Sequence, residues 1–395
     1  MVKRVISTVA GSALFLGAAL AAVPGTSAAA ARSTGPAVAA QAPRCTALTV
    51  LRAMTLQQRV GQIFMVGTPA TSASPTVLDQ ISRYHVGNVF LGGRSSGGTA
   101  DPSRTTSALR SRVGPSSTAK AALFIATDQE GGYVQVLQGN GFSRIPTALT
   151  QGSWAPSTIE RDAATWARQL AAVGINLNLA PVAGTVPSAA VARRNPPIGA
   201  FDRQYGYTSY KTAAGSAAFV RGMTAGGVGS TTKHFPGLGV VSGNTDTTAG
   251  VHDRSTAATS AYLNPFRADI RDGATAVMMS SAIYDKIDAS TLAVFSTKVV
   301  GLVRSAGFTG PIMTDDVGNA VQPGRWPVAN RVLNSLYAGV DLILTVNPSV
   351  LPAMYDAVLG RARSDIWWLK RVNNAAYVVL LAKERRGMLT ASCST

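Results

Sequence analysis

The amino-acid sequence predicts an α/β protein, a single (β/α)8 barrel of the TIM type with a C-terminal helical extension. Short apolar segments alternate with helical patterns along the chain, there are eight such segments, and two more helical patterns follow the last one. Strand–helix alternation is typical of parallel βαβ units, and eight units can close into a barrel. The alternative is an open doubly wound sheet. It differs from a barrel in having a reversal of strand order, which cannot be seen in a sequence.

The eight expected strands are short and mostly apolar, as parallel strands buried on both faces should be. "FMVGT" is the first, and "INLNLAPV", the fourth, alternates with period two. In chain order, the strands are expected at residues 64–68, 87–93, 123–128, 175–182, 227–235, 276–281, 311–316 and 341–346.

Helical patterns precede the last five of these strands, and each ends at or near a glycine, which commonly terminates helices. These patterns cover residues 161–174, 209–227, 264–274, 297–308 and 329–339. The C-terminal extension is expected to consist of two further helices, at residues 349–360 and 367–386.

The N-terminal segment has the features of an export signal. Lys3 and Arg4 form its basic start, residues 5–23 are apolar, and "PGTSAAAA" supplies small residues for cleavage. We therefore expect a signal peptide at 1–30, a disordered leader at 31–44 that is rich in Ala, Ser, Pro and Gly, and one barrel domain at 45–395. A membrane anchor is the alternative for the apolar run, but the Gly-Ala-rich composition favours cleavage. The protein is then secreted or associated with the cell wall, with no membrane attachment after cleavage.

The two cysteines, Cys45 and Cys393, bracket the predicted domain. In an exported protein this placement suggests one disulfide that joins the two ends, and two unrelated thiols are the alternative. Two distant cysteines cannot form a cysteine-based zinc site, and the chain has no H-E-x-x-H motif, so we expect no metal and no cofactor.

The formal net charge is +17 at pH 7. Such a charge on an exported protein favours attraction to the anionic polymers of a cell wall. Binding to nucleic acid is not expected, because the arginines are scattered and no recognition motif accompanies them.

Polar residues gather at the carboxyl ends of three expected strands, where the chemistry of (β/α)8 barrels takes place. They stand in "TDQEGG" after the third strand, "KHFPG" after the fifth and "TDDVGN" after the seventh. Successive side chains on a strand point to opposite faces, so only one of Asp315 and Asp316 should face the barrel axis, and Lys233 and His234 should diverge.

Two carboxylates on one rim suggest glycoside hydrolysis, which needs an acid near the leaving oxygen and a second carboxylate near the anomeric carbon. Serine-hydrolase chemistry has less support, because the chain contains no G-x-S-x-G. Paired carboxylates are a weak signal when they stand alone.

Four motifs, in this order, resemble those of family 3 glycoside hydrolases. They are "ATDQEGGYVQ" (126–135), "IGAFDRQYG" (198–206), "KHFPGLG" (233–239) and "IMTDDVGNA" (312–320). The sequence is most similar to the single-domain branch of β-N-acetylglucosaminidases, or β-N-acetylhexosaminidases, that trim peptidoglycan fragments. The resemblance runs from about residue 50 to 385, and "KHFPG" together with "TDD" is its most specific part.

The resemblance implies a (β/α)8 barrel and a retaining mechanism with a covalent glycosyl-Asp intermediate. By position, Asp315 matches the family's nucleophile. The positions that hold the N-acetylglucosamine ring match Asp128, Arg203, Lys233 and His234. The implied substrates are cell-wall, peptidoglycan-derived or chitin-type oligosaccharides, from which terminal β-N-acetylglucosamine is removed.

The general acid/base is where the sequence departs from the family. The family's Asp-Ser-His triplet falls on Asn244, Thr245 and Asp246, so that an aspartate replaces the histidine. We expect Asp246 to be the acid/base, because a carboxylic acid in a partly desolvated site can do this work. His252, on the same loop, is the second candidate for the acid/base. The third possibility is that neither residue is catalytic and that the segment is simply a polar loop.

Substrate preference is affected by two further departures. Tyr133 and Val136 stand where the family often has arginines, and Gly184 replaces an expected acid. The alternatives to the predicted hexosaminidase are a β-glucosidase of the same family and a non-catalytic barrel that binds cell-wall sugars. Many such β-glucosidases carry their acid/base on a second domain, of which we find no sign.

Overall fold

The computed structural model describes residues 45–389. The predicted signal peptide (1–30), the leader (31–44) and Cys393, one end of the predicted disulfide, lie outside the described residues. Within residues 45–389, no helix has both the length and the apolar composition needed to cross a bilayer.

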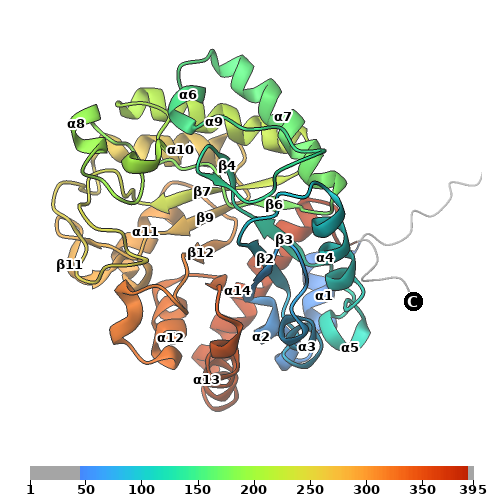
Figure 1. Ribbon diagram of the computed structural model, residues 1–395. Coiled ribbons are helices and arrows are strands. Elements are labelled where there is room, and N and C mark those ends of the chain that lie inside the picture. Colours follow the sequence, from blue (N-terminus) through green and yellow to red (C-terminus); the bar gives the residue numbers. More distant parts are fainter. Residues whose placement is uncertain (1–44, 390–395) are drawn as a thin grey trace, which may run out of the picture. The chain divides into compact units, whose positions relative to one another are not determined.

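The centre of the fold is an eight-stranded parallel sheet that curls into a barrel, as predicted (Figure 1). The strands follow the order β12-β9-β7-β6-β3-β2-β1-β13. The two ends meet through a parallel bridge between Met313 and Leu342. The strands are β1 (Phe64–Pro69), β2 (Asn88–Gly92), β3 (Phe124–Thr127), β6 (Leu177–Asn178), β7 (Gly229–Phe235), β9 (Ala276–Met279), β12 (Ile312–Thr314) and β13 (Ile343–Thr345).

All eight expected strands are present, and the fourth is shorter than the pattern suggested. Only Leu177–Asn178 belong to the regular ladder of β6. Pro181 has no N–H to donate, which limits continuous pairing in the middle of a sheet. Pairing with β7 resumes at an isolated bridge between Val182 and Lys233, near the mouth of the barrel.

Helices surround the barrel, and half of those described begin at a residue whose side chain accepts a hydrogen bond from the first turn. Thr208 caps α9, Ser296 caps α11 and Asp365 caps α14 in this way. The helices are α1 (Ala47–Ala53), α2 (Leu56–Gln62), α3 (Pro75–Arg83), α4 (Ala100–Arg110), α5 (Pro115–Thr118), α6 (Ala148–Gln151), α7 (Pro156–Ala172), α8 (Ala189–Ala192), α9 (Ser209–Ala225), α10 (Asn264–Arg271), α11 (Thr297–Ser305), α12 (Val328–Ala338), α13 (Leu351–Ser364) and α14 (Ile366–Arg385). The predicted C-terminal extension is therefore α13 and α14.

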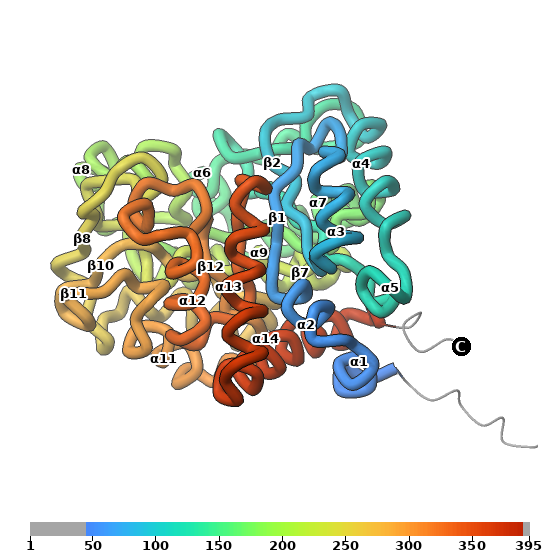
Figure 2. Tube along the Cα trace, turned by 90° about the horizontal axis from the view of Figure 1, so that it is seen from below, coloured from blue at the N-terminus to red at the C-terminus, as the bar shows by residue number. Residues whose placement is uncertain are grey.

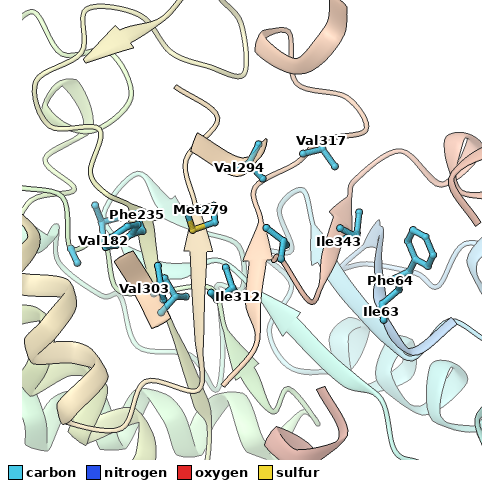
Figure 3. Close-up of a cluster of buried hydrophobic side chains, with 14 of the residues drawn as sticks. Ile63, Phe64, Val182, Phe235, Met279, Val294, Val303, Ile312, Val317 and Ile343 are labelled. Carbon is cyan, nitrogen blue, oxygen red and sulfur yellow. The ribbon is translucent and has the colours of Figure 1, made fainter. Parts of the chain in front are cut away.

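Two apolar layers hold the barrel, one on each side of its wall. The outer layer lies between strands and helices, and Figure 3 shows Phe235, Met279 and Ile312 as part of it. The inner layer fills the barrel with alternate strand residues, including Met65 and Phe124. At the amino ends of the strands, α14 contributes Val379 and Ala382 to the inner layer, so the barrel is closed at that end. In the view from below, α14 and α1 lie side by side (Figure 2), and both contribute to a smaller apolar cluster.

Two small sheets at the barrel mouth were not predicted. One is the hairpin of β4 (Gln129–Gly131) and β5 (Val134–Gln135), directly after β3. The other joins β8 (His252–Asp253), β10 (Ile283–Tyr284) and β11 (Asp288–Leu292). Both are built from the loops that follow barrel strands, so they shape the rim around the predicted site.

Candidate active site

A cavity of about 300 Å³ lies at the carboxyl ends of the barrel strands. Apolar residues of the barrel form part of its wall, and the polar residues come from the end of β7 and from the loops after β3, β6, β7 and β12. The cavity is lined by Phe90, Asp128, Leu179, Arg203, Lys233, His234, Asp246, Met278, Asp315, Asp316, Asn319, Ala320, Leu344 and Val346. Of the seven predicted site residues, six line this cavity, and His252 does not.

Lys233 lies at the centre of a charged network on one side of the cavity. Its side chain is only 3% exposed, and Nζ lies 2.6 Å from Asp128 Oδ1 and 2.6 Å from Glu130 Oε1. Arg203 donates two hydrogen bonds to Glu130, of 2.7 and 2.8 Å, and a third to the Pro197 carbonyl oxygen. The network holds the ends of Asp128, Lys233 and Arg203 at fixed positions around the cavity.

The charges of the network keep Glu130 and Lys233 ionised although both are buried. Burial alone would raise the pKa of Glu130, but Arg203 and Lys233 outweigh it and lower that pKa to about 2. Burial would likewise lower the pKa of Lys233, and Asp128 and Glu130 raise it instead. Within residues 45–389, no group of three or more His, Cys, Asp and Glu side chains is arranged to hold a metal ion.

Glu130 is a site residue that the sequence analysis missed. It stands in the "DQEGG" motif, whose role was assigned to Asp128 alone. Its partner Arg203 is 73 residues away in the chain, so no local pattern connects the two. The signal that could have revealed Glu130 is its position, two residues after Asp128 in a motif already judged to lie at the barrel mouth.

We predict that Glu130→Gln lowers the free energy of unfolding by about 3 kcal/mol, because it removes the one carboxylate paired with Arg203 among residues 45–389 and leaves Lys233 with Asp128 alone. Urea unfolding at pH 7 measures this change. The matched control is Glu160→Gln, which removes a carboxylate paired with Arg221 on the surface and should cost less than about 1 kcal/mol. Equal losses in the two variants would contradict a special role for the buried network.

Lys233 and His234 both line the cavity, although adjacent strand residues were expected to diverge. The reason is a bulge at the end of β7. Thr232 pairs with Val277 and Phe235 with Met279, so one extra residue is accommodated in β7 between these two pairs. A bulge breaks the regular alternation of side chains and redirects them.

Asp315 directly follows β12 and lies opposite His234. The distance between His234 Nε2 and Asp315 Oδ2 is 3.8 Å. Burial, followed by the positive charges of Arg203 and Lys233, lowers the pKa of His234 well below its usual value, so the imidazole is neutral at pH 7. Burial is also the main cause that raises the pKa of Asp315, to about 7, and the negative charge of Asp246 is the next.

Asp316 reaches the same cavity, in contrast to the expectation that only one of the two aspartates would do so. Its Oδ1 accepts hydrogen bonds from the backbone N–H groups of Gly318, Asn319 and Val346. These bonds tie the loop after β12 to the end of β13. Asp316 therefore organises the loop, and Asp315 presents the less encumbered carboxylate.

Asp246 lies on the long loop after β7, which is docked against the loop after β12. The carbonyl oxygens of Thr245 and Asp246 accept hydrogen bonds from Gln322 N and Val321 N. The Asn244 side chain accepts a further bond from Asp246 N. Much of Asp246 is open to solvent, but its carboxyl lies deep enough among protein atoms that burial raises its pKa. Both carboxyls, Asp246 and Asp315, thus hold protons at higher pH than ordinary aspartates do.

His252 takes a different position. It lies on β8, and its Nδ1 is 2.6 Å from Asp285 Oδ1. Both side chains are about one-third exposed. The parallel pairing of β8 with β10 holds His252 on the small outer sheet. In this structure, Asp246 and not His252 shares a cavity with Asp315.

Comparisons with known proteins identify the family to which the chain belongs. The model of the glycosyl hydrolase family 3 N-terminal domain matches residues 55–380. A β-hexosaminidase of Stenotrophomonas maltophilia is 30% identical over 336 residues, which cover 82% of this chain and 96% of that protein.

Solved structures lead to the same family. A β-N-acetylhexosaminidase from Beutenbergia cavernae is 48% identical, has a TM-score of 0.82, and is matched over 84% of this chain and 98% of that one. A family 3 β-N-acetylglucosaminidase from a Paenibacillus species is 28% identical with a TM-score of 0.77, over 87% of this chain and 64% of that one. The chain described here therefore belongs to glycoside hydrolase family 3 and is a glycoside hydrolase.

Proposed function

We propose that the protein removes terminal β-N-acetylglucosamine from cell-wall or chitin-type oligosaccharides by a retaining mechanism. The observation that carries the proposal is that Asp315 and Asp246 line one cavity, and that both carboxyls have a raised pKa. Two carboxylic groups that share a site can together retain one proton near neutrality. Such a pair supplies the nucleophile and the acid that glycoside hydrolysis needs. The relative from Beutenbergia cavernae, whose name states this activity, supports the choice of sugar.

The charged network binds the sugar and orients it. In the proposed complex, Asp128 accepts hydrogen bonds from sugar hydroxyls, while Arg203 and Lys233 donate to its oxygens. Because Glu130 holds both cations, these donors need little reorganisation when the sugar binds. The imidazole of His234 lies beside Asp315 and is neutral. It therefore forms no ion pair with the Asp315 carboxylate, which stays free to act as the nucleophile.

In the first step, a carboxylate oxygen of Asp315 attacks the anomeric carbon, and the bond from that carbon to the aglycone oxygen breaks. Asp246 gives its proton to the departing oxygen. In the second step, Asp246 takes a proton from water, the water oxygen bonds to the anomeric carbon, and the ester to Asp315 breaks. Both steps invert the anomeric centre, so the product retains the β configuration.

The natural setting that we propose is the cell wall. The predicted signal peptide directs the chain out of the cytoplasm, and the net charge of +17 favours residence near anionic wall polymers. Fragments of peptidoglycan would then be available to the enzyme. Localisation of the full-length chain by cell fractionation, with and without residues 1–30, examines this part of the proposal separately from the chemistry.

The direct experiment is hydrolysis of p-nitrophenyl β-N-acetylglucosaminide, followed by proton NMR. We expect β-N-acetylglucosamine to appear first and to mutarotate afterwards, because the mechanism retains configuration. p-Nitrophenyl β-glucoside is the matched control, with a rate at least about 100-fold lower if the acetamido group is recognised. Preference for the glucoside would favour a β-glucosidase, and binding without turnover of either would favour a non-catalytic barrel.

A further inference from the structure

A second hollow, of about 910 Å³, lies beside the catalytic cavity. We call it the outer groove. It is lined by Arg94, Gly132, Tyr133, Gln135, Gln138, Gly139, Phe142, Ser143, Arg144, Ile145, Pro146, Thr147 and Thr150. The residues come from the loop after β2, from the hairpin β4–β5 and from the segment that leads to α6. Nothing in the proposed mechanism uses this groove.

The outer groove adjoins the catalytic cavity through the hairpin β4–β5. Asp128 lines the cavity and Gly132 lines the groove, and the four residues that separate them span at most about 14 Å. A second link runs through Phe201, two residues before Arg203, whose ring centroid is 6.1 Å from that of Tyr133. A substrate that extends beyond one sugar ring can therefore reach the groove.

Two aromatic rings stand exposed at this junction. Tyr133 is 61% exposed and Phe201 is 44% exposed, although large apolar side chains are usually more buried. Their rings meet edge to face, at an interplanar angle of 69°. The apolar face of a pyranose ring packs well on an aromatic surface of this kind. Tyr133 is also one of the positions at which the sequence departs from the family's arginines.

The floor of the outer groove is rigid. The Gln135 side chain donates to the carbonyl oxygens of Leu137 and Ser143 and accepts from Ile145 N. Gly132 has a φ of +58°, and an added Cβ would lie 2.5 Å from Thr147 Cγ2, so the hairpin requires glycine there. A groove held in this way is formed before a ligand arrives, which lowers the entropic cost of binding.

The charged residues that line the outer groove are both arginines. Neither Arg94 nor Arg144 forms an ion pair with any carboxylate of residues 45–389, and both are exposed. Arg94 donates to the backbone carbonyl oxygens of Tyr133 and Gln135, at 3.3 and 3.5 Å, which holds it against the hairpin. The guanidinium fork is well suited to carboxylates.

We propose that the outer groove binds the aglycone of the substrate and selects aglycones that carry a carboxylate. Arg144 and Arg94 pair with the carboxylate, and Tyr133 with Phe201 packs against the sugar ring that bears it. The inference rests on the proposed function and decides between its two substrate classes. It favours acidic, peptidoglycan-like fragments over neutral chitin-type chains.

The experiment compares three disaccharides with N-acetylglucosamine β-linked to N-acetylmuramic acid. One carries the free lactyl carboxylate, one the corresponding carboxamide, and one an acidic Ala–Glu dipeptide on the lactyl group. We expect kcat/KM for an acidic substrate to exceed that for the carboxamide by about fivefold, as exposed ion pairs allow. The preference should shrink towards one in roughly 0.5 M salt. Whichever acidic substrate is favoured shows whether the sugar or the peptide supplies the carboxylate.

Arg144→Gln should lower the ratio of acid to carboxamide, and Arg144→Glu should bring it below one. Arg144 makes no hydrogen bond through its side chain among residues 45–389, so these substitutions leave the hairpin's hydrogen bonds in place. Arg112→Gln, an exposed arginine outside both hollows, is the control and should keep the wild-type ratio. Equal rates on acid and carboxamide in the wild type, with p-nitrophenyl β-N-acetylglucosaminide cleaved, would overturn this inference alone. Failure to cleave any of these substrates would count against the proposed function instead.

Discussion

Asp315→Gly is expected to lower kcat/KM for p-nitrophenyl β-N-acetylglucosaminide by about 10⁴-fold or more, a loss of roughly 5.5 kcal/mol of transition-state stabilisation. The reason is chemical, since without the carboxylate no covalent intermediate can form. Steady-state release of p-nitrophenol measures the effect. Because Asp315 is buried and its pKa is raised to about 7, its removal should not destabilise the fold, and urea unfolding checks this point.

Azide separates a nucleophile from other causes of inactivity. The space left by Asp315→Gly admits azide, which attacks the anomeric carbon from the side that Asp315 occupied and yields the α-glycosyl azide. The product is identified by NMR. Asp79→Asn, an exposed aspartate on α3 with no role in the site, is the control and should retain full activity. A fully active Asp315→Gly variant would remove the nucleophile assignment, and with it the retaining mechanism.

The barrel could be predicted because each strand carries its own local signal. "FMVGT" and "DLILTV" are nearly continuous apolar runs, and both are strands of the sheet, β1 and β13. The hairpin β4–β5 and the strand β8 carry no such signal, because strands of two or three residues are too short to display a period. They are held by contacts with the rest of the rim.

The site was predicted best where a residue directly follows a strand. Asp128 and Asp315 stand at such positions, so the strand pattern alone places them at the barrel mouth. Glu130 and the docking of Thr245 on Gln322 depend on contacts between distant segments. The divergence expected for Lys233 and His234 was wrong for a similar reason, since a bulge in β7 is set by its pairing with β9. Local patterns thus locate the rim, and tertiary contacts decide which side chains meet there.

Asp246→Ala is expected to lower kcat/KM by about 10³-fold on a disaccharide, whose leaving oxygen needs a proton. On the p-nitrophenyl substrate, the leaving group departs without needing a proton, so Asp246→Ala slows formation of the glycosyl-enzyme only a little. Hydrolysis of the glycosyl-enzyme still needs a base, so this second step is slowed more. Azide then attacks the accumulated glycosyl-Asp315 and restores turnover, with the β-glycosyl azide as product. The two aspartates are therefore distinguished by opposite anomers of the same product.

His252→Ala is the matched comparison. His252 pairs with Asp285 on the outer sheet and does not line the catalytic cavity, so we expect its replacement to change kcat/KM by less than about threefold. A loss of about 10³-fold in His252→Ala, with azide rescue, would reverse the assignment. The loop after β7 would then have to bring His252 inward during turnover, in place of Asp246.

The pH profile of kcat/KM gives a second test of the role of Asp246 in proton transfer. The wild-type profile of kcat/KM should be bell-shaped, because Asp315 must be ionised and Asp246 protonated. The negative charge of Asp246 is one cause of the raised pKa of Asp315. Asp246 is protonated in the active form, so its negative charge acts only on the alkaline side, and Asp246→Ala leaves the acidic limb, where Asp315 ionises, close to its wild-type pH. The alkaline limb disappears, because no group is left whose deprotonation stops the first step. A variant that is slow but keeps both limbs at their wild-type pH would show that Asp246 shapes the loop without exchanging the proton.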